Sequence, residues 1–232
     1  MKKYAVFAAL LALGAALAGA ESEERSIHAI GVNVPIWNHR LPNIAYLSDE
    51  DFGSGDFDLE TFAVGVDFMY HHLKVRESRF SSFVDVEFGY SNFKPELDGK
   101  SFDSSDFNLD GFNTRFGFGL GGAPLVNDFV TLAVHGTFGL DVAFAMSSAS
   151  YNTVTVDQFL FNFWTTVGAN IDAAFHFTNR VGLYVGVDFY INLIGLGVYG
   201  RDSSSYNSVI DLFYVSPGGF NTDIRVGVSF KF

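Results

Sequence analysis

The last eleven residues of the chain alternate strictly between two kinds of side chain, and this pattern constrains the fold most. From Thr222 to Phe232, every second residue is apolar or a threonine, and those between are polar, charged or glycine. A period of two places the two sets on opposite faces of a β-strand. The strand therefore separates an apolar environment from a polar one.

Seven earlier segments carry the same alternation, at about 26–38, 59–71, 79–91, 110–121, 128–146, 158–177 and 181–193. The connections between segments alternate between short ones and long, polar ones, and we expect the long ones outside the cell. This pattern predicts an all-β fold, an eight-stranded antiparallel up-and-down transmembrane β-barrel of an outer membrane. A ten-stranded barrel is the alternative, because the apolar segments 196–199 and 209–215 are able to form a further hairpin.

Alternation alone does not say which face is inside, because a soluble lipocalin-like barrel also has eight strands but turns its apolar face inward. The polar face here is mostly glycine, alanine, serine, threonine and asparagine, with single charges. A water-exposed exterior would carry many lysines and glutamates, whereas a narrow eight-stranded interior has room mainly for small residues. We therefore expect the apolar face to meet lipid.

The first twenty residues differ in composition from the remainder. Lys2 and Lys3 precede an apolar run that ends in the small residues Ala18, Gly19 and Ala20. A basic start, a short apolar middle and a small-residue end are typical of a secretory signal peptide. We expect residues 1–20 to be this signal and residues 21–232 to form one barrel domain, with an N-terminal membrane anchor as the alternative.

Charge and cysteine content exclude two classes of protein. The chain has no cysteine, which excludes a secreted domain held together by disulfides. Its formal net charge is −12, and such an acidic chain is a poor candidate for binding nucleic acid. No apolar run after residue 20 reaches the roughly 20 residues that a spanning helix needs, so strands would make the contact with lipid.

On these segments, the chain resembles the small bacterial outer-membrane barrels of the OmpX, OmpA and OmpW type. The resemblance covers nearly all of the chain after residue 20, and it rests on the strand number, the loop asymmetry and the alternating C-terminal strand that ends in Phe230 and Phe232. It implies that outer-membrane lipid surrounds the protein. It also implies that the barrel assembly machinery reads Phe230 and Phe232 as an assembly signal.

Charged residues recur on the face expected to line the lumen. Counting along each strand from the short turns places both arginines of this face level with a carboxylate on a neighbouring strand. This predicts two cross-strand ion pairs, Asp188 with Arg225 and Asp85 with Arg115. Their simplest role is to fill and rigidify a narrow interior, and a thin path favouring cations is the alternative. The expected lumen charges are Asp85, Glu87, Arg115, His135, Asp188 and Arg225, with His135 beside Arg115.

The first long connection holds the other candidates for chemistry. Asp49, Asp51 and Glu60 fall where an EF-hand calcium loop places carboxylates, but Gly53 replaces a ligand and Ser54 replaces the glycine of the sharp turn. They predict at most weak binding of a divalent cation. Serine, histidine and aspartate also occur in this connection, without the setting of a nucleophile, a base and an orienting acid. We expect no enzymatic activity and no cofactor.

Two functions remain open from the sequence. The first is a structural or surface-interaction role: membrane integrity, adhesion, or contact with a host or another surface ligand through the loops. The second is a narrow channel for ions or small solutes, including hydrophobic ones. The first is favoured, because the narrow lumen is expected to be filled.

Overall fold

The computed structural model describes residues 24–47, 52–97, 100–101, 109–151, 154–203, 206–216 and 219–232, so the predicted signal peptide lies outside the described residues. No helix in this part of the chain is long and apolar enough to cross a membrane. The strands are β1 (Arg25–Leu47), β2 (Phe52–Val75), β3 (Phe80–Leu97), β4 (Lys100–Ser101), β5 (Leu109–Val126), β6 (Val130–Tyr151), β7 (Val154–His176), β8 (Val181–Ser203), β9 (Tyr206–Ser216) and β10 (Phe220–Lys231).

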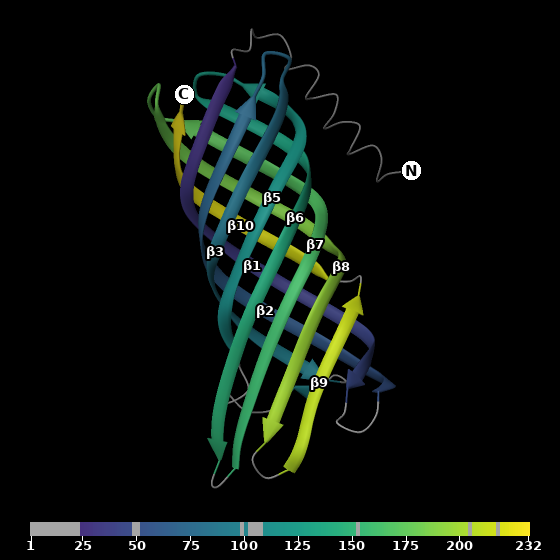
Figure 1. The fold of residues 1–232 in the computed structure, drawn as a ribbon. Helices are drawn as coiled ribbons and strands as arrows, with labels where there is room; N and C mark the ends of the chain where they lie inside the picture. Colours follow the sequence, from purple (N-terminus) through teal and green to yellow (C-terminus); the bar gives the residue numbers. More distant parts are fainter. Residues whose placement is uncertain are drawn as a thin grey trace.

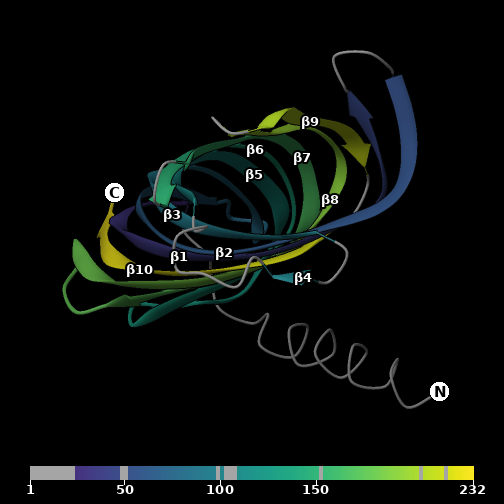
Figure 2. The same ribbon diagram turned by 90° about the horizontal axis from the view of Figure 1, so that it is seen from below.

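Eight of these strands form a closed antiparallel barrel, which confirms the predicted fold class (Figures 1 and 2). Each barrel strand pairs with the next along the chain, from β1 to β3 and from β5 to β8, and β3 pairs with β5. The C-terminal strand β10 closes the ring, because it pairs with β8 on one side and with β1 on the other, from Ile27↔Lys231 to Asn38↔Phe220.

Strand β9 adds no further strand to the ring. It pairs with β8 from Gly195↔Ser216 onward and touches β1 at Ala45↔Phe213, whereas β10 pairs with the other half of β8. The two strands therefore follow one another along the same line between β8 and β1, separated by residues 217–219. The hairpin predicted from segments 196–199 and 209–215 forms, and the barrel remains eight-stranded.

The strands continue through most of the segments expected to be long loops. Strand β6 runs to Tyr151 and β7 begins at Val154, where the sequence pattern predicts a connection from about residue 147 to 157. The hairpin continues because pairing across the two strands satisfies their backbone N–H and C=O groups residue by residue. The connections at the opposite end are short, as predicted: residues 76–79, 127–129 and 177–180.

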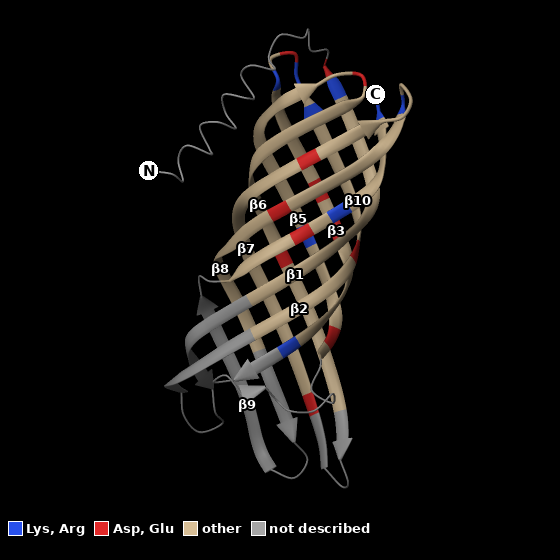
Figure 3. Cartoon of the chain, turned by 180° about the vertical axis from the view of Figure 1, so that it is seen from behind, with Lys and Arg blue, Asp and Glu red and all other residues tan. Residues whose placement is uncertain are grey.

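The exterior of the barrel is apolar. Outward-facing side chains such as Val66, Phe68, Phe112 and Leu120 are each more than half exposed. Charged residues midway along the strands, such as Asp85, Arg115 and Asp188, are buried inside the barrel, and Figure 3 shows that charged positions are sparse along the tan strands. Apolar patches of this extent are rare on proteins surrounded by water, and a closed barrel satisfies every strand's hydrogen bonds within a bilayer. The predicted orientation, with the apolar face toward lipid, follows from this arrangement.

Candidate functional site in the barrel lumen

The inward-facing side chains form three layers. The end nearer the long hairpins is filled by an apolar layer of Trp37, Ala63, Phe93, Leu109, Ala143, Ala145, Leu160 and Trp164. The end nearer the short turns is filled by a second apolar layer of Ile27, Leu73, Val75, Phe83, Ala123, Val126, Ala133 and Ala174. A charged layer lies between them, and its carboxylates are Asp67, Asp85, Glu87, Asp141, Asp172, Asp188 and Asp223.

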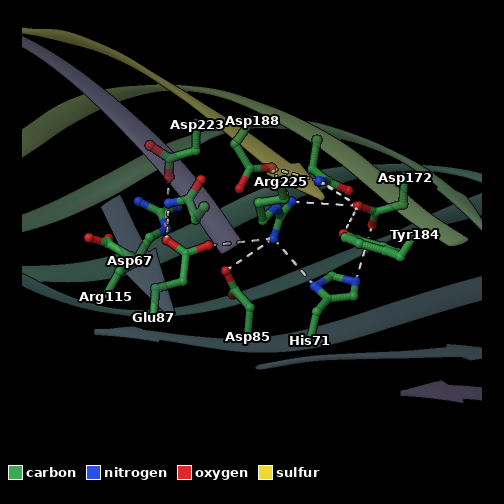
Figure 4. Close-up of polar contacts among 12 residues, drawn as sticks. Asp67, His71, Asp85, Glu87, Arg115, Asp172, Tyr184, Asp188, Asp223 and Arg225 are labelled. Carbon is green, nitrogen blue, oxygen red and sulfur yellow. Dashed lines mark hydrogen bonds and ion pairs between the residues drawn. The ribbon is translucent and has the colours of Figure 1, made fainter. Parts of the chain in front are cut away.

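Arg225 on β10 is the centre of the charged layer (Figure 4). Its Nη2 lies 2.8 Å from Asp188 Oδ1 and 3.5 Å from Asp172 Oδ1, and its Nη1 lies 3.3 Å from Asp85 Oδ2. The Nη1 atom also lies 3.3 Å from His71 Nδ1. Because the planar guanidinium offers several N–H donors in fixed directions, one arginine connects strands β2, β3, β7, β8 and β10 across the lumen.

Arg115 on β5 organises the remainder of the layer. Its Nη1 donates to both carboxylate oxygens of Asp141, each 3.1 Å away. Its Nε lies 3.9 Å from Asp223 Oδ2, and the guanidinium stacks 3.8 Å above the ring of Tyr190. Tyr190 in turn donates a hydrogen bond to Asp223, so the ring connects the cation and the second carboxylate. Stacking on an aromatic face is favourable for a desolvated guanidinium.

Amide and hydroxyl donors hold the other carboxylates. Asn170 donates to Asp188 at 2.6 Å and to Asp172 at 3.0 Å, and Tyr184 also donates to Asp172. On the opposite wall, Asn33 donates to Glu87 and Asn113 donates to Asp67. Hydrogen bonds to a charged acceptor are the stronger ones, and a connected network of them specifies one arrangement of side chains.

The charged layer is closed to water. Its seven carboxylates and two arginines each expose at most 4% of their surface. A continuous channel wide enough for water would leave part of the surface of its lining side chains accessible. The described lumen is therefore filled at this level, and apolar layers cover it on both sides.

Glycines on the inner face make room for the large side chains of the lumen. A Cβ on Gly117 would lie 2.0 Å from Asp85 Oδ1, and one on Gly195 would lie 1.7 Å from the Trp164 ring. Each glycine thus faces a bulky group on the neighbouring strand. The high glycine content of the polar face reflects close packing of the interior.

The structure places the predicted lumen charges inside the barrel but changes their partners. Asp188 contacts Arg225, whereas Arg115 contacts Asp141 and Asp85 contacts Arg225. Counting along the strands ignored their stagger: Arg115 lies opposite Glu87 on β3 and opposite Asp141 on β6. The same stagger separates His135 from Arg115, since His135 lies opposite Gly121.

A serine, a histidine and an aspartate meet beside the charged layer, an arrangement that sequence reasoning missed. Ser81 Oγ lies 2.9 Å from His135 Nε2, and His135 Nδ1 lies 3.5 Å from Asp172 Oδ2 and 2.9 Å from Asn170 Oδ1. This is the order of contacts found in a hydrolase triad. Ser81 and Asp172, however, have no exposed surface and His135 has 2%. The Ser81 hydroxyl is thus enclosed by protein, and the contacts among the three residues hold β3 against β6 and β7.

We expect Ser81 to be inert toward serine-directed reagents, because its hydroxyl is enclosed by protein. Incubation of the folded barrel with a fluorophosphonate probe, followed by mass spectrometry, should show no adduct on Ser81. The Ser81→Ala variant is the matched control for background labelling. Stoichiometric labelling of Ser81 that disappears in this variant would show that the site is accessible and reactive.

The predicted cation-binding residues lie outside what the structure describes: Asp49 and Asp51 are not described, and of Glu60 only the backbone is. Among the described residues, no group of three or more histidine, aspartate or glutamate side chains is arranged to hold a metal ion. At the rim, a hydrogen bond from Lys74 lowers the pKa of the Glu24 carboxyl below its ordinary value. Lys74 Nζ and Glu24 Oε1 lie 2.7 Å apart in an exposed ion pair.

No protein-family model and no curated protein matches the chain. Among solved structures, OprG from Pseudomonas aeruginosa aligns over 92% of this chain and 98% of its own, with a TM-score of 0.51 and 8% identity. The chain has the fold of an outer-membrane β-barrel. A major outer membrane protein from Thermus thermophilus aligns over 88% of this chain and 99% of its own, with a TM-score of 0.48 and 16% identity. The outer-membrane protease OmpT from Escherichia coli aligns over 92% and 98%, with a TM-score of 0.35 and 10% identity.

The closed β-barrel fold, which OprG shares, and the apolar exterior indicate where the protein lies. Side chains that are exposed and apolar around the barrel need lipid as their surroundings, and a bacterial outer membrane is where barrels of this kind are found. Outer-membrane lipid is therefore its immediate environment. A general role as a barrel of the bacterial outer membrane follows from the fold and the exterior together.

Proposed function

We propose that this protein is a non-conducting outer-membrane barrel with a structural role, which stabilises the membrane and presents its long hairpins to the cell's surroundings. The observation that supports this role is the filled lumen. A charged layer lies between two apolar layers, and each of its carboxylates and arginines exposes at most 4% of its surface. A barrel packed in this way is rigid, because its interior resembles the core of a soluble protein.

The alternative, a narrow channel, would require the charged layer to open. Arg225 would have to break its contacts with Asp188, Asp172 and Asp85 at the same time. Large rings such as Trp164 would also have to move out of the apolar layer nearer the long hairpins. Separating one buried charge from its partners typically costs about 3–5 kcal/mol, so an open state would be scarce without a ligand that stabilises it. The structural role is therefore the better supported proposal.

We also propose that residues 1–20 direct export and that the long hairpins contact host or other surface ligands. We further propose that the assembly machinery reads the C-terminal strand. Phe232 supports the last proposal by its position, since its N–H donates to the carbonyl of Ser26 at 2.8 Å and its carbonyl accepts from Ser26 N–H at 3.1 Å. Phe232 thus also pairs with the start of β1.

Deleting Phe232 should lower the folded fraction recovered from outer membranes several-fold. The deletion removes two backbone hydrogen bonds of the closing pair together with the proposed assembly signal. The measurement is the intensity of the heat-modifiable band in electrophoresis. Phe177→Ala, which changes an exposed phenylalanine at the same end of the barrel, is the matched control and should leave that band unchanged. An unchanged folded fraction in the Phe232 deletion would contradict the assembly role.

The structural role itself is tested by removing the gene and restoring it. We expect the deletion strain to leak a periplasmic enzyme and to become sensitive to a large antibiotic, and the wild-type gene to restore both properties. A variant with shortened hairpins at residues 147–157 should restore integrity but not surface contacts. Intact barrier function in the deletion strain would contradict the proposed role.

A further inference from the structure

A group of polar side chains lies on the lipid-facing side of the barrel, near the short turns. His28 on β1 and His72 on β2 are directly paired across the two strands, and their rings stack with centroids 4.2 Å apart and planes 7° from parallel. Ser26 Oγ lies 2.8 Å from His72 Nε2, and Tyr70 Oη lies 2.8 Å from His28 Nδ1. Polar groups are costly next to hydrocarbon, so they mark the depth at which the headgroup layer begins.

A shallow, open apolar groove of about 350 Å³ adjoins this group, and it is lined by His28, Phe230 and Phe232. The Phe232 ring lies edge-on to the His28 ring, with centroids 5.3 Å apart, and it is 77% exposed. Exposed Ile30 and Val228, which pair across β1 and β10, continue the apolar surface toward the middle of the barrel. The groove therefore joins a polar region at the rim to the hydrocarbon belt.

One cationic residue lies to each side of the β1–β10 strand pair that carries the groove. Lys74 on β2 lies opposite Ser26 on β1, and its side chain forms an ion pair with the acidic Glu24. Arg180 lies on the other side, because its carbonyl accepts a hydrogen bond from the N–H of Lys231 on β10, and it is exposed. The site thus combines imidazole and hydroxyl groups, flanking cations and an apolar groove.

We propose that this surface binds a phospholipid of the periplasm-facing leaflet, with its phosphate at Ser26, His28 and His72 and one acyl chain in the groove beside Phe230 and Phe232. A phosphate accepts hydrogen bonds from imidazole N–H and hydroxyl groups and is attracted by Lys74 and Arg180. An acyl chain covers apolar rings that would otherwise face the membrane without a fixed partner. The proposal rests on the membrane orientation in the proposed function, but not on the proposed role in integrity.

Native mass spectrometry of the detergent-solubilised, folded barrel tests the proposal. Phosphatidylglycerol is added in one arm, a neutral diacylglycerol in a second, and phosphatidylglycerol with excess inorganic phosphate in a third. We expect one phosphatidylglycerol to be retained, and about tenfold less retention in the His28→Leu/His72→Leu variant, equivalent to about 1.4 kcal/mol. Asn179→Leu, a polar-to-apolar change at the same end but outside the cluster, should retain lipid as the wild type does.

Several results would overturn the site. Equal retention by the double variant, or equal retention of diacylglycerol, would show that no phosphate-anchored lipid site exists. Complete displacement by inorganic phosphate would show that the site takes free phosphate and that the acyl chain in the groove adds nothing to binding. A dimer mass that the wild type shows and the double variant lacks would show that a second copy of the chain covers the surface instead. Heat-modifiability of each variant confirms that the barrel is folded before retention is compared. Loss of retention in the variant, with no barrier defect in the gene deletion, would leave the lipid site standing and remove only the structural role.

Discussion

Replacing Arg225 with glutamine lowers the free energy of unfolding of the barrel by about 3–5 kcal/mol, the usual cost of removing one partner from a buried ion pair. Arg225 has no exposed surface, and its guanidinium lies within 3.5 Å of Asp188, Asp172 and Asp85. Without it, three carboxylates face one another in a closed lumen. Urea unfolding of the barrel from lipid vesicles measures the loss. Arg76→Gln, at an exposed arginine of the rim, should change stability by no more than about 0.5 kcal/mol.

A double-mutant cycle with Asp188→Asn separates the pair from the remainder of the network. We expect the double variant to recover part of the loss, with a coupling of about 0.5–3 kcal/mol, because the shortest contact of Arg225 is to Asp188. The recovery should be incomplete, since Asp85 and Asp172 still lack their cation. Strictly additive losses would disprove the pairing.

Replacing Gly31 with valine should lower the free energy of unfolding by at least about 2 kcal/mol, toward the upper part of the range for overpacked sites. The change acts at the closing seam, the pairing of β1 with β10. Gly31 on β1 lies directly opposite Gly227 on β10. A Cβ at Gly31 would lie 2.1 Å from the Val226 carbonyl oxygen and 2.4 Å from Gly227 Cα. These are backbone atoms, which cannot rotate away, so the two strands would have to separate. The shift of the urea midpoint measures the loss.

Gly136→Val is the matched control for this change. Gly136 also lies within a barrel strand, but a Cβ there would meet only the Leu120 carbonyl oxygen, at 3.9 Å. We expect its folded fraction and its urea midpoint to stay close to those of the wild type. Equal losses at Gly31 and Gly136 would show that valine acts through strand propensity, and that close approach at the seam does not matter.

The fold could be predicted because alternation is a local property of each strand. Segments such as 222–232 show their two faces without reference to any other part of the chain, and eight such segments with alternating connection lengths leave few arrangements. The extended hairpins were harder to predict, because pairing through residues 147–157 depends on the partner strand as much as on local composition. The course of β9 along the line of β10 likewise depends on pairing to β8.

The contacts inside the lumen could be predicted only in part, because they depend on the stagger between strands. Arg225 lies opposite Gly186 and reaches Asp188 diagonally, a contact that counting along each strand can only approximate. The sequence pattern does not predict the apolar layers, because most residues of the inner face are small or polar. Large residues in the inward register, such as Trp164 and Phe83, were the signal that could have revealed them.

The claim that the lumen is closed is tested most directly by recording current through planar bilayers that contain the folded barrel. The filled layer around Arg225 predicts conductance at the background level for the wild type at both signs of voltage. It predicts the same for the Asp188→Asn/Arg225→Gln variant, because the apolar layers remain in place. Reproducible stepwise conductance from the wild-type barrel would contradict a closed lumen and favour the channel.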